Sequence, residues 1–221
     1  MVKMINILWG INMKILNLYA GIGGNRKLWG DKHDITAVEI VPEVAKIYQD
    51  YFPQDKVIID DAHEYLRKHF REFDFIWASP PCPTHSVLQM VRYYDENLKY
   101  PDMTLYQEII LLQNFFKGKW VVENVKPYYK PLIQPTFIME RHCYWSSDYI
   151  FTQEHNDGSF SEIKDNVKDM EKAYNFDLSK YKNTTDLRKC LRNAVKPQDG
   201  LFIFKQITKD FKQNERKVKN V

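Results

Sequence analysis

The sequence predicts an α/β protein with a doubly wound, mostly parallel sheet. Short apolar runs alternate with segments of helical spacing, and glycine-rich or acidic residues follow several of the apolar runs. A chain of 221 residues, 44% of them hydrophobic, is long enough to bury one substantial core of this kind. Because ligands bind beyond the carboxyl ends of parallel strands, the residues after each strand are the first candidates for a functional site.

The expected elements follow one another along the chain. Strands are predicted at 13–19, 34–40, 56–60, 73–78 and 120–125, with a strand pair within 135–151. Helices are predicted at 25–30, 42–51, 62–70, 104–116, 186–194 and 197–209. The polar segment 87–102 is expected to be a mobile loop. Segment 152–185 is weakly patterned and is expected to form loops or a small polar insert.

Composition excludes several classes of protein. No apolar run approaches the ~20 residues that a membrane span needs, and no signal peptide is recognisable. Cys82, Cys143 and Cys190 form no Cys-x-x-Cys pair, so neither a disulfide framework nor a metal site is expected, and a cytoplasmic location fits. The net charge of +3 permits a polyanionic partner without requiring one.

The first twelve residues precede a second methionine, Met13, which opens the first predicted strand. The codons of Trp9 and Gly10 are G-rich and lie just upstream of Met13, where a ribosome-binding site would stand. We expect Met13 to be the initiating residue, and N-terminal sequencing of the native protein tests this.

A glycine-rich turn follows the first predicted strand. Gly21, Gly23 and Gly24 allow the backbone to approach a ligand closely, although a tight strand-to-helix turn explains them equally well. Arg26 stands where a G-x-G-x-x-G pattern would have its last glycine. Glu39 closes the second strand, where an acid commonly accepts both ribose hydroxyls of an adenosine-containing cofactor; a solvated carboxylate is the alternative.

Two acids follow the third predicted strand. Asp60 and Asp61 could hold the adenine amino group of such a cofactor. Alternatively, Asp61 could cap the helix that follows it.

A cysteine follows the fourth predicted strand. Prolines 80, 81 and 83 stiffen the backbone around Cys82, so its thiol is held at the ligand edge and is placed for nucleophilic attack. Attack needs a thiolate, and a lowered pKa is therefore expected; the alternative is a small buried hydrophobic residue. Glu123 follows the next strand and is a candidate acid, or one half of a hydrogen-bonded pair with Asn124.

Together these motifs resemble the DNA cytosine-5 methyltransferase family. NLYAGIGG, residues 17–24, resembles its cofactor loop, and SPPCPTHS, residues 79–86, resembles its Pro-Pro-Cys nucleophile motif. Glu123-Asn124-Val125 matches its Glu-Asn-Val motif. LRNAVKPQDGLFIF, residues 191–204, resembles the final motif, whose Asn-Ala-Val packs against the cofactor loop. Several motifs in the same order are a far stronger signal than any one of them.

The resemblance implies a Rossmann-like methyltransferase fold with S-adenosylmethionine as cofactor. Cys82 would add to carbon 6 of cytosine, Glu123 would donate a proton to ring nitrogen 3, and Arg141 would contact the base or its phosphate. Carbon 5 of the resulting enamine can then take a methyl group, and loss of the carbon 5 proton releases Cys82. The residues implied in cofactor binding are Tyr19, Ala20, Gly21, Ile22, Gly23, Gly24, Glu39, Ile40, Asp61, Ala62, Pro80, Asn193, Ala194 and Val195.

The chain departs from the family in two places. The Gln-x-Arg-x-Arg motif is represented by Glu140-Arg141-His142, with a single arginine. Only residues 152–185 stand where the family has a large recognition domain. We therefore divide the chain into a catalytic cofactor-binding domain (13–151), a reduced recognition insert (152–185), closing helices that complete the domain (186–209) and a frayed tail (210–221).

Cytosine in DNA, flipped out of its stack, is the leading expected substrate, with little intrinsic sequence selection. RNA or a free cytosine nucleotide is the alternative, as is a catalytically silent cofactor-binding subunit. A separate specificity subunit could choose the target, and the expected setting is a bacterium or a phage-infected host cell. Methyltransferases acting on cytosine N4 share Ser-Pro-Pro but carry an aromatic residue where Cys82 stands. Cations that could grip phosphates, or could be ordinary surface, are Lys180, Lys182, Arg188, Lys189, Arg192, Lys205 and Lys209.

Overall fold

The computed structural model describes residues 12–92, 99–150 and 166–209. Its strands form one seven-stranded sheet in the order β3-β2-β1-β4-β5-β7-β6. Only β7 runs antiparallel to its neighbours, β5 and β6. The bounds are β1 (Lys14–Leu18), β2 (Asp34–Val38), β3 (Lys56–Ile58), β4 (Phe75–Ala78), β5 (Lys119–Val125), β6 (Phe137–Met139) and β7 (His142–Ser146). The predicted doubly wound, mostly parallel sheet is confirmed.

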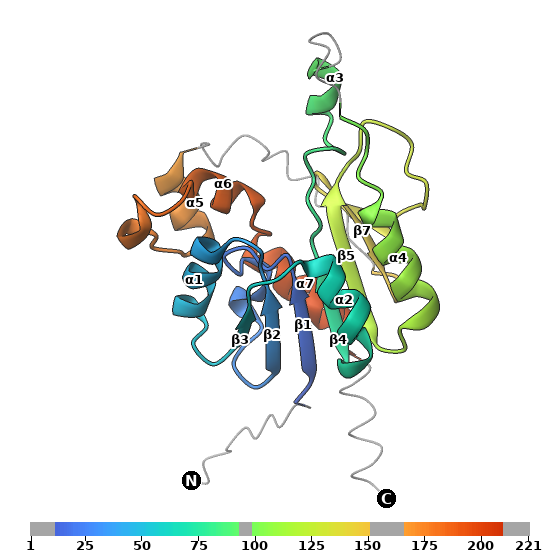
Figure 1. Ribbon diagram of the computed structural model, residues 1–221, viewed down its shortest axis with the longest axis horizontal. Helices are drawn as coiled ribbons and strands as arrows, with labels where there is room; N and C mark the ends of the chain where they lie inside the picture. The colour runs from blue at the N-terminus through green and yellow to red at the C-terminus, as the bar shows by residue number, and fades with distance from the viewer. Residues whose placement is uncertain (1–11, 93–98, 151–165, 210–221) are drawn as a thin grey trace, which may run out of the picture.

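Helices cover both faces of the sheet (Figure 1). The described α-helices are α1 (Pro42–Tyr51), α2 (Ala62–His69), α3 (Leu88–Arg92), α4 (Thr104–Phe115), α5 (Val167–Tyr174), α6 (Leu187–Asn193) and α7 (Pro197–Ile207). Short 3-10 turns are η1 (Asn25–Leu28), η2 (Phe70–Glu72) and η4 (Ser179–Tyr181). None of these helices is both long and apolar enough to cross a membrane.

The central strand β4 is buried on both sides, as its unbroken apolar sequence predicts for a parallel sheet. Phe75 and Trp77 pack on one face with Phe204 of α7. Ile76 and Ala78 pack on the other face with α2 and α4. β4 pairs with β1 on one side and with β5 on the other, so the carboxyl ends of the three strands lie side by side. The candidate site lies at these ends and on the loops that follow them.

The segment expected to be a mobile loop, 87–102, begins with the short helix α3, so that expectation was wrong for residues 88–92. The Ser86 hydroxyl accepts a hydrogen bond from the Leu88 N–H at 3.3 Å, as a helix-capping serine does. In Figure 1, α3 projects beyond the carboxyl edge of the sheet. Residues 93–98 lie outside the described residues.

Part of the weakly patterned segment 152–185 is helical rather than loop. The Asn166 side chain caps α5 by accepting from the Asp169 N–H, and Asn175 ends the helix in the left-handed conformation. Met170 and Tyr174 pack with residues of α1 and α6 in one hydrophobic cluster. The helix is only eight residues long and highly charged, which explains its weak sequence signal. The division of the chain into domain, insert and closing helices stays a prediction.

A buried ion pair supports the turn after the glycine-rich loop. Arg26, at the position expected for a third glycine, turns inward and makes two hydrogen bonds to the Asp55 carboxylate, at 2.9 and 3.1 Å. Tyr48 donates to the same carboxylate at 2.9 Å, and all three residues are buried. Arg26 therefore anchors η1 to the region between α1 and β3.

We expect Asp55→Ala to lower the free energy of unfolding by about 3–5 kcal/mol, because it leaves the buried Arg26 without its counter-ion. Asp31 also contacts Arg26, at 3.5 Å, but its side chain is 79% exposed. Asp31→Asn is therefore the matched control and should change stability by less than about 0.5 kcal/mol. Urea unfolding of the two variants measures the difference, and equal losses would contradict the role given to Asp55.

Candidate active site

The glycine-rich loop connects β1 to η1 and depends on its three glycines. Gly21 and Gly23 have φ of +55° and +82°, which glycine adopts most readily. A Cβ atom at Gly24 would collide with the Val195 carbonyl and crowd Ala194. The structure thus seats Ala194 and Val195 directly on the loop, and Asn193, which ends α6, is exposed beside them.

Other loop residues face the interior. Ala20 is buried and its N–H donates to the Val38 carbonyl at 3.0 Å. Ile22 is buried among residues of α5 and α6, so its side chain supports the loop from behind. Gly21 differs, because a Cβ atom there would meet nothing within 4 Å. The open side of the loop therefore lies at Gly21.

Glu39, at the end of β2, is held against this open side. Its carboxylate accepts hydrogen bonds from the N–H of Gly21 at 2.9 Å and of Val41 at 3.0 Å. Asp61, after β3, caps α2 by accepting from the Glu64 N–H at 2.9 Å, as the alternative interpretation held. Ala62 is buried behind it, in the first turn of α2.

The surface between these acids suits an adenosine group. Ile40 and Ile59 follow the neighbouring strands β2 and β3 and are 61% and 58% exposed, although they are apolar. Exposed apolar side chains beside carboxylates can cover the faces of a purine while the acids accept from ribose hydroxyls. The residues present therefore fit the adenosine part of S-adenosylmethionine, which Glu39, Ile40 and the Gly21 backbone would hold.

We expect Ile40→Ser to weaken S-adenosylhomocysteine binding about tenfold, since an apolar contact worth roughly 1–1.5 kcal/mol is lost. Its thermal stability should stay near wild type, because the side chain is mostly exposed. Isothermal titration calorimetry measures the affinity. Ile110→Ser, half-exposed on α4, is the control, and equal affinity losses would remove Ile40 from the cofactor site.

Behind the loop, Tyr19 joins a buried acid that the sequence analysis missed. Its hydroxyl donates to Glu108 Oε1 at 2.5 Å, and His63 Nδ1 lies 3.2 Å from the same oxygen. Burial raises the pKa of Glu108, and the contact with Glu108 raises the pKa of His63. The signal was available, because Glu108 is the one acid in the apolar segment TLYQEIILLQNFF.

Cys82 is half-buried on the loop after β4, and its backbone is tightly held. Its carbonyl accepts from the N–H of His85 at 3.0 Å and of Ser86 at 3.1 Å. The preceding Pro80 is buried, and its carbonyl accepts from Asn124 Nδ2 at 3.0 Å. Asn124 therefore fixes the cysteine loop, and its proposed pairing with Glu123 is wrong because neighbouring strand residues face opposite sides.

The free protein does not lower the pKa of Cys82 as the sequence analysis expected. Burial raises the pKa of the thiol, and the nearby Glu123 carboxylate raises it further. The positive charges of Arg141 and Arg192 oppose this rise without overcoming it. The raised pKa has a clear cause, since an enclosed thiol beside a carboxyl group cannot ionise easily.

Glu123 lies buried near the end of β5. Burial raises the pKa of its carboxyl to about 7, and Ser79 and Arg141 oppose that rise only in part. Trp77 Nε1 donates to the Ser79 hydroxyl at 3.0 Å and so orients it. A carboxyl group that keeps its proton close to neutral pH can act as a general acid.

The β6–β7 hairpin brings a further side chain to Glu123. His142 Nε2 lies 3.5 Å from Glu123 Oε1, a contact that the sequence analysis did not predict. Arg141 is exposed, and its Nη2 donates to the Arg192 carbonyl at 3.3 Å. The structure thus brings Arg141 close to Cys82 and Glu123 but does not point it into a buried pocket.

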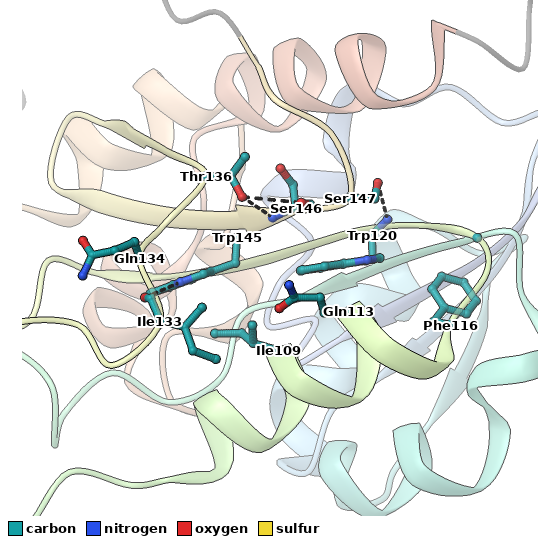
Figure 2. Close-up of a pocket in the computed structure, with 11 residues that line it drawn as sticks. Ile109, Gln113, Phe116, Trp120, Ile133, Gln134, Thr136, Trp145, Ser146 and Ser147 are labelled. Atoms are coloured by element: carbon teal, nitrogen blue, oxygen red, sulfur yellow. Dashed lines mark hydrogen bonds between the residues drawn. The ribbon is translucent and has the colours of Figure 1, made fainter.

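Figure 2 shows a pocket of about 360 Å³ that is separate from this site. It lies between α4 and the other end of β5, with the indole rings of Trp120 and Trp145 among its lining side chains. Trp120 is the second residue of β5, whereas Glu123 lies toward its carboxyl end. In the described part of the chain, no cluster of three or more His, Cys, Asp or Glu residues could hold a metal ion.

The glycine loop, the strand-end acids and the strand order with antiparallel β7 define a Rossmann-like methyltransferase. The family described as C-5 cytosine-specific DNA methylase matches residues 13–137, more than half of the chain. The chain belongs to this family, and its cofactor is S-adenosylmethionine. The match covers the glycine loop, Cys82 and Glu123, whereas Arg141 and the segment 193–195 lie outside it.

Among individual proteins, the chain is similar to a tRNA (cytosine(38)-C(5))-methyltransferase of Spodoptera frugiperda, with 28% identity over 131 residues. The matched region covers 57% of this chain but only 39% of that relative. A solved structure of a DNMT2 variant from Spodoptera frugiperda matches with a TM-score of 0.37 and 28% identity, covering 51% of this chain and 35% of its own. A SAM-dependent methyltransferase from Agrobacterium tumefaciens matches with a TM-score of 0.39 and 14% identity, covering 54% and 40%.

Proposed function

We propose that this chain methylates carbon 5 of cytosine in DNA through a covalent adduct of Cys82. The observation that carries the proposal is the pairing of a thiol and a proton-bearing carboxyl at one edge of the sheet. Cys82 and Glu123 lie close enough for the charge of Glu123 to raise the pKa of the thiol. The glycine loop and the exposed Ile40 lie at the carboxyl ends of neighbouring strands.

Each residue has a defined task in this proposal. The Cys82 thiolate adds to carbon 6, and Glu123 gives its proton to ring nitrogen 3, so the ring becomes an enamine without building up negative charge. When bound, S-adenosylmethionine supplies the methyl group that carbon 5 accepts. Solvent then takes the carbon 5 proton, the bond between carbon 6 and sulfur breaks to return Cys82 as a thiolate, and nitrogen 3 returns its proton to Glu123.

A group of cations around the site supports a polyanionic substrate. Arg141 and Arg192 act to lower the pKa of Cys82. Arg141, Lys196 and Lys126 act to lower the pKa of His142. The group consists of Lys126, Arg141, Arg192 and Lys196, of which Lys196 also pairs with Glu140 at 2.6 Å. Charges grouped beside a reactive thiol can hold the phosphates that flank a flipped nucleotide. Lys180, expected among such contacts, instead pairs with Asp50 at 3.1 Å.

RNA is the second candidate substrate, because the relative from Spodoptera frugiperda is named for a cytosine of tRNA. Transfer of tritiated methyl groups to duplex DNA, single-stranded DNA, tRNA and dCTP separates the candidates. We expect DNA to be labelled. Labelling of tRNA alone, or of dCTP alone, would refute the DNA proposal while keeping the chemistry.

A catalytically silent subunit would label none of these substrates. Mapping 5-methylcytosine in the genome of a host that expresses the chain then gives the sequence preference. A host without new 5-methylcytosine, together with an unlabelled set of substrates, would overturn the proposed function.

A further inference from the structure

His142 begins β7 and shares a face of the sheet with Glu123. In the antiparallel β5–β7 pair, Glu123 lies opposite Tyr144 and Val125 lies opposite His142. Opposed residues project to the same side, and so do residues two apart along a strand. The imidazole therefore reaches the carboxyl, with 3.5 Å between Nε2 and Oε1.

The rest of the hairpin tip is directed elsewhere. Glu140 has a φ of +50° and accepts a hydrogen bond from Lys196 Nζ at 2.6 Å. Arg141 donates to the Arg192 carbonyl. These two contacts fasten the tip to the last turn of α6 and to the residue before α7. Of the three tip residues, His142 is therefore the one whose side chain faces the Glu123 carboxyl.

We propose that His142 is a positioning residue, a neutral donor whose Nε2–H holds Glu123 Oε1 so that the Oε2 proton points at the substrate. This inference rests on the proposed function, in which Glu123 is the acid. For Oε2 to donate, Oε1 must accept, so the tautomer that serves the reaction carries its proton on Nε2. The 3.5 Å separation is long for a hydrogen bond, as catalytic contacts often are before substrate binds.

The surroundings favour a neutral pair over an ion pair. The pKa of His142 is lowered to about 3, first by burial and then by the charges of Arg141, Lys196 and Lys126. Burial raises the pKa of Glu123 to about 7, so a proton on this pair resides on the carboxyl and not on the imidazole. The charged and titratable groups around the pair are Cys82 after β4, Lys126 after β5, Glu140, Arg141 and Tyr144 on the hairpin, Arg192 in the last turn of α6, and Lys196 just before α7.

A neutral donor has a consequence that a cation would not have. A positive charge fixed at this distance would stabilise the Glu123 carboxylate and lower its pKa, so the carboxyl would lose the proton that the reaction needs. An imidazole that stays uncharged orients the carboxyl and leaves its proton in place. The test is therefore to exchange a neutral donor for a charged one.

The direct readout is the ¹³C NMR titration of the Glu123 carboxyl in the full chain, without cofactor or nucleic acid. Its signal is assigned by its loss in Glu123→Gln. We expect His142→Arg to move the midpoint from about 7 to lower pH by roughly 1–3 pH units, and His142→Gln to leave it near wild type. Ile138→Arg adds the same charge to a 48% exposed residue on the other face of the hairpin and is the matched control.

Kinetics then separate orientation from folding. His142→Phe keeps the ring and removes the donor, so kcat should fall about 10- to 100-fold with KM nearly unchanged, and His142→Gln should restore most of the loss. An unmoved Glu123 midpoint in His142→Arg, or equal kcat in His142→Phe and His142→Gln, would overturn the inference. A protein that methylates nothing refutes the proposed function, while the titration still decides the role of His142.

Discussion

Replacing Cys82 with serine should reduce methyl transfer by at least about 10³-fold, because a serine hydroxyl stays un-ionised where the reaction needs a thiolate. The structure makes this variant a clean one. Cys82 is only half-buried, and its backbone, through the carbonyl that accepts from His85 and Ser86, holds the loop whatever the side chain. Thermal stability should therefore remain close to wild type.

A covalent adduct can be observed directly with DNA that contains 5-fluorocytosine. Fluorine at carbon 5 cannot leave as a proton, so the bond between sulfur and carbon 6 persists after methyl transfer. Wild-type chain should form a denaturant-resistant complex in the presence of S-adenosylmethionine, and Cys82→Ser should form none. Cys190→Ser is the matched control, since Cys190 is also half-buried but packs against the α5–α6 cluster. A complex trapped by Cys82→Ser would exclude Cys82 as the nucleophile.

Replacing Glu123 with glutamine should lower kcat/KM by about 10²–10⁴-fold, because an amide cannot transfer a proton to ring nitrogen 3. The buried site should accept glutamine, which has nearly the same shape. The variant also changes the pH dependence of the reaction, and this separates loss of an acid from a general disturbance of the loop.

The sign of that pH dependence follows from two groups that share one proton in the productive form. Cys82 must be ionised and Glu123 protonated, yet the pKa of Glu123 is about 7 and burial raises that of Cys82 above its ordinary value. Between these two pKa values, most protein molecules carry one proton on the Cys82–Glu123 pair, and the productive form is one of these singly protonated forms. The wild-type kcat/KM should therefore rise through pH 7, stay level, and fall above the pKa of Cys82.

Glu123→Gln should lose the limb near pH 7, and its residual activity should increase with the thiolate fraction up to the pKa of Cys82. Initial rates between pH 5.5 and 10, at low substrate concentration, measure both profiles. A wild-type profile without a limb near neutrality, or a limb that survives in Glu123→Gln, would contradict the assignment of Glu123 as the acid.

Much of this site was predictable from the sequence because parallel strands deliver their carboxyl ends to one edge. Glu39 and Cys82 each follow a recognisable strand and Glu123 lies near the end of one, and topology then brings them together. The short helices α3 and α5 were missed, since their signals lie in a few capping contacts and two buried side chains. Glu108 stands out in the sequence as the one acid of an apolar helix, but its partners Tyr19 and His63 come from other segments and could be known only from the tertiary structure.

The fold class, the glycine loop and the candidate thiol and carboxyl could be recognised from the sequence, since they depend on local patterns and on chain order. The ionisation of the thiol and the carboxyl depends on their surroundings in the folded protein. Burial sets the pKa of Cys82 and Glu123, and burial depends on side chains distant in sequence. Only the pairing of β5 with β7 brings His142 to Glu123 and leaves Arg141 outside, because which face a strand residue occupies depends on register.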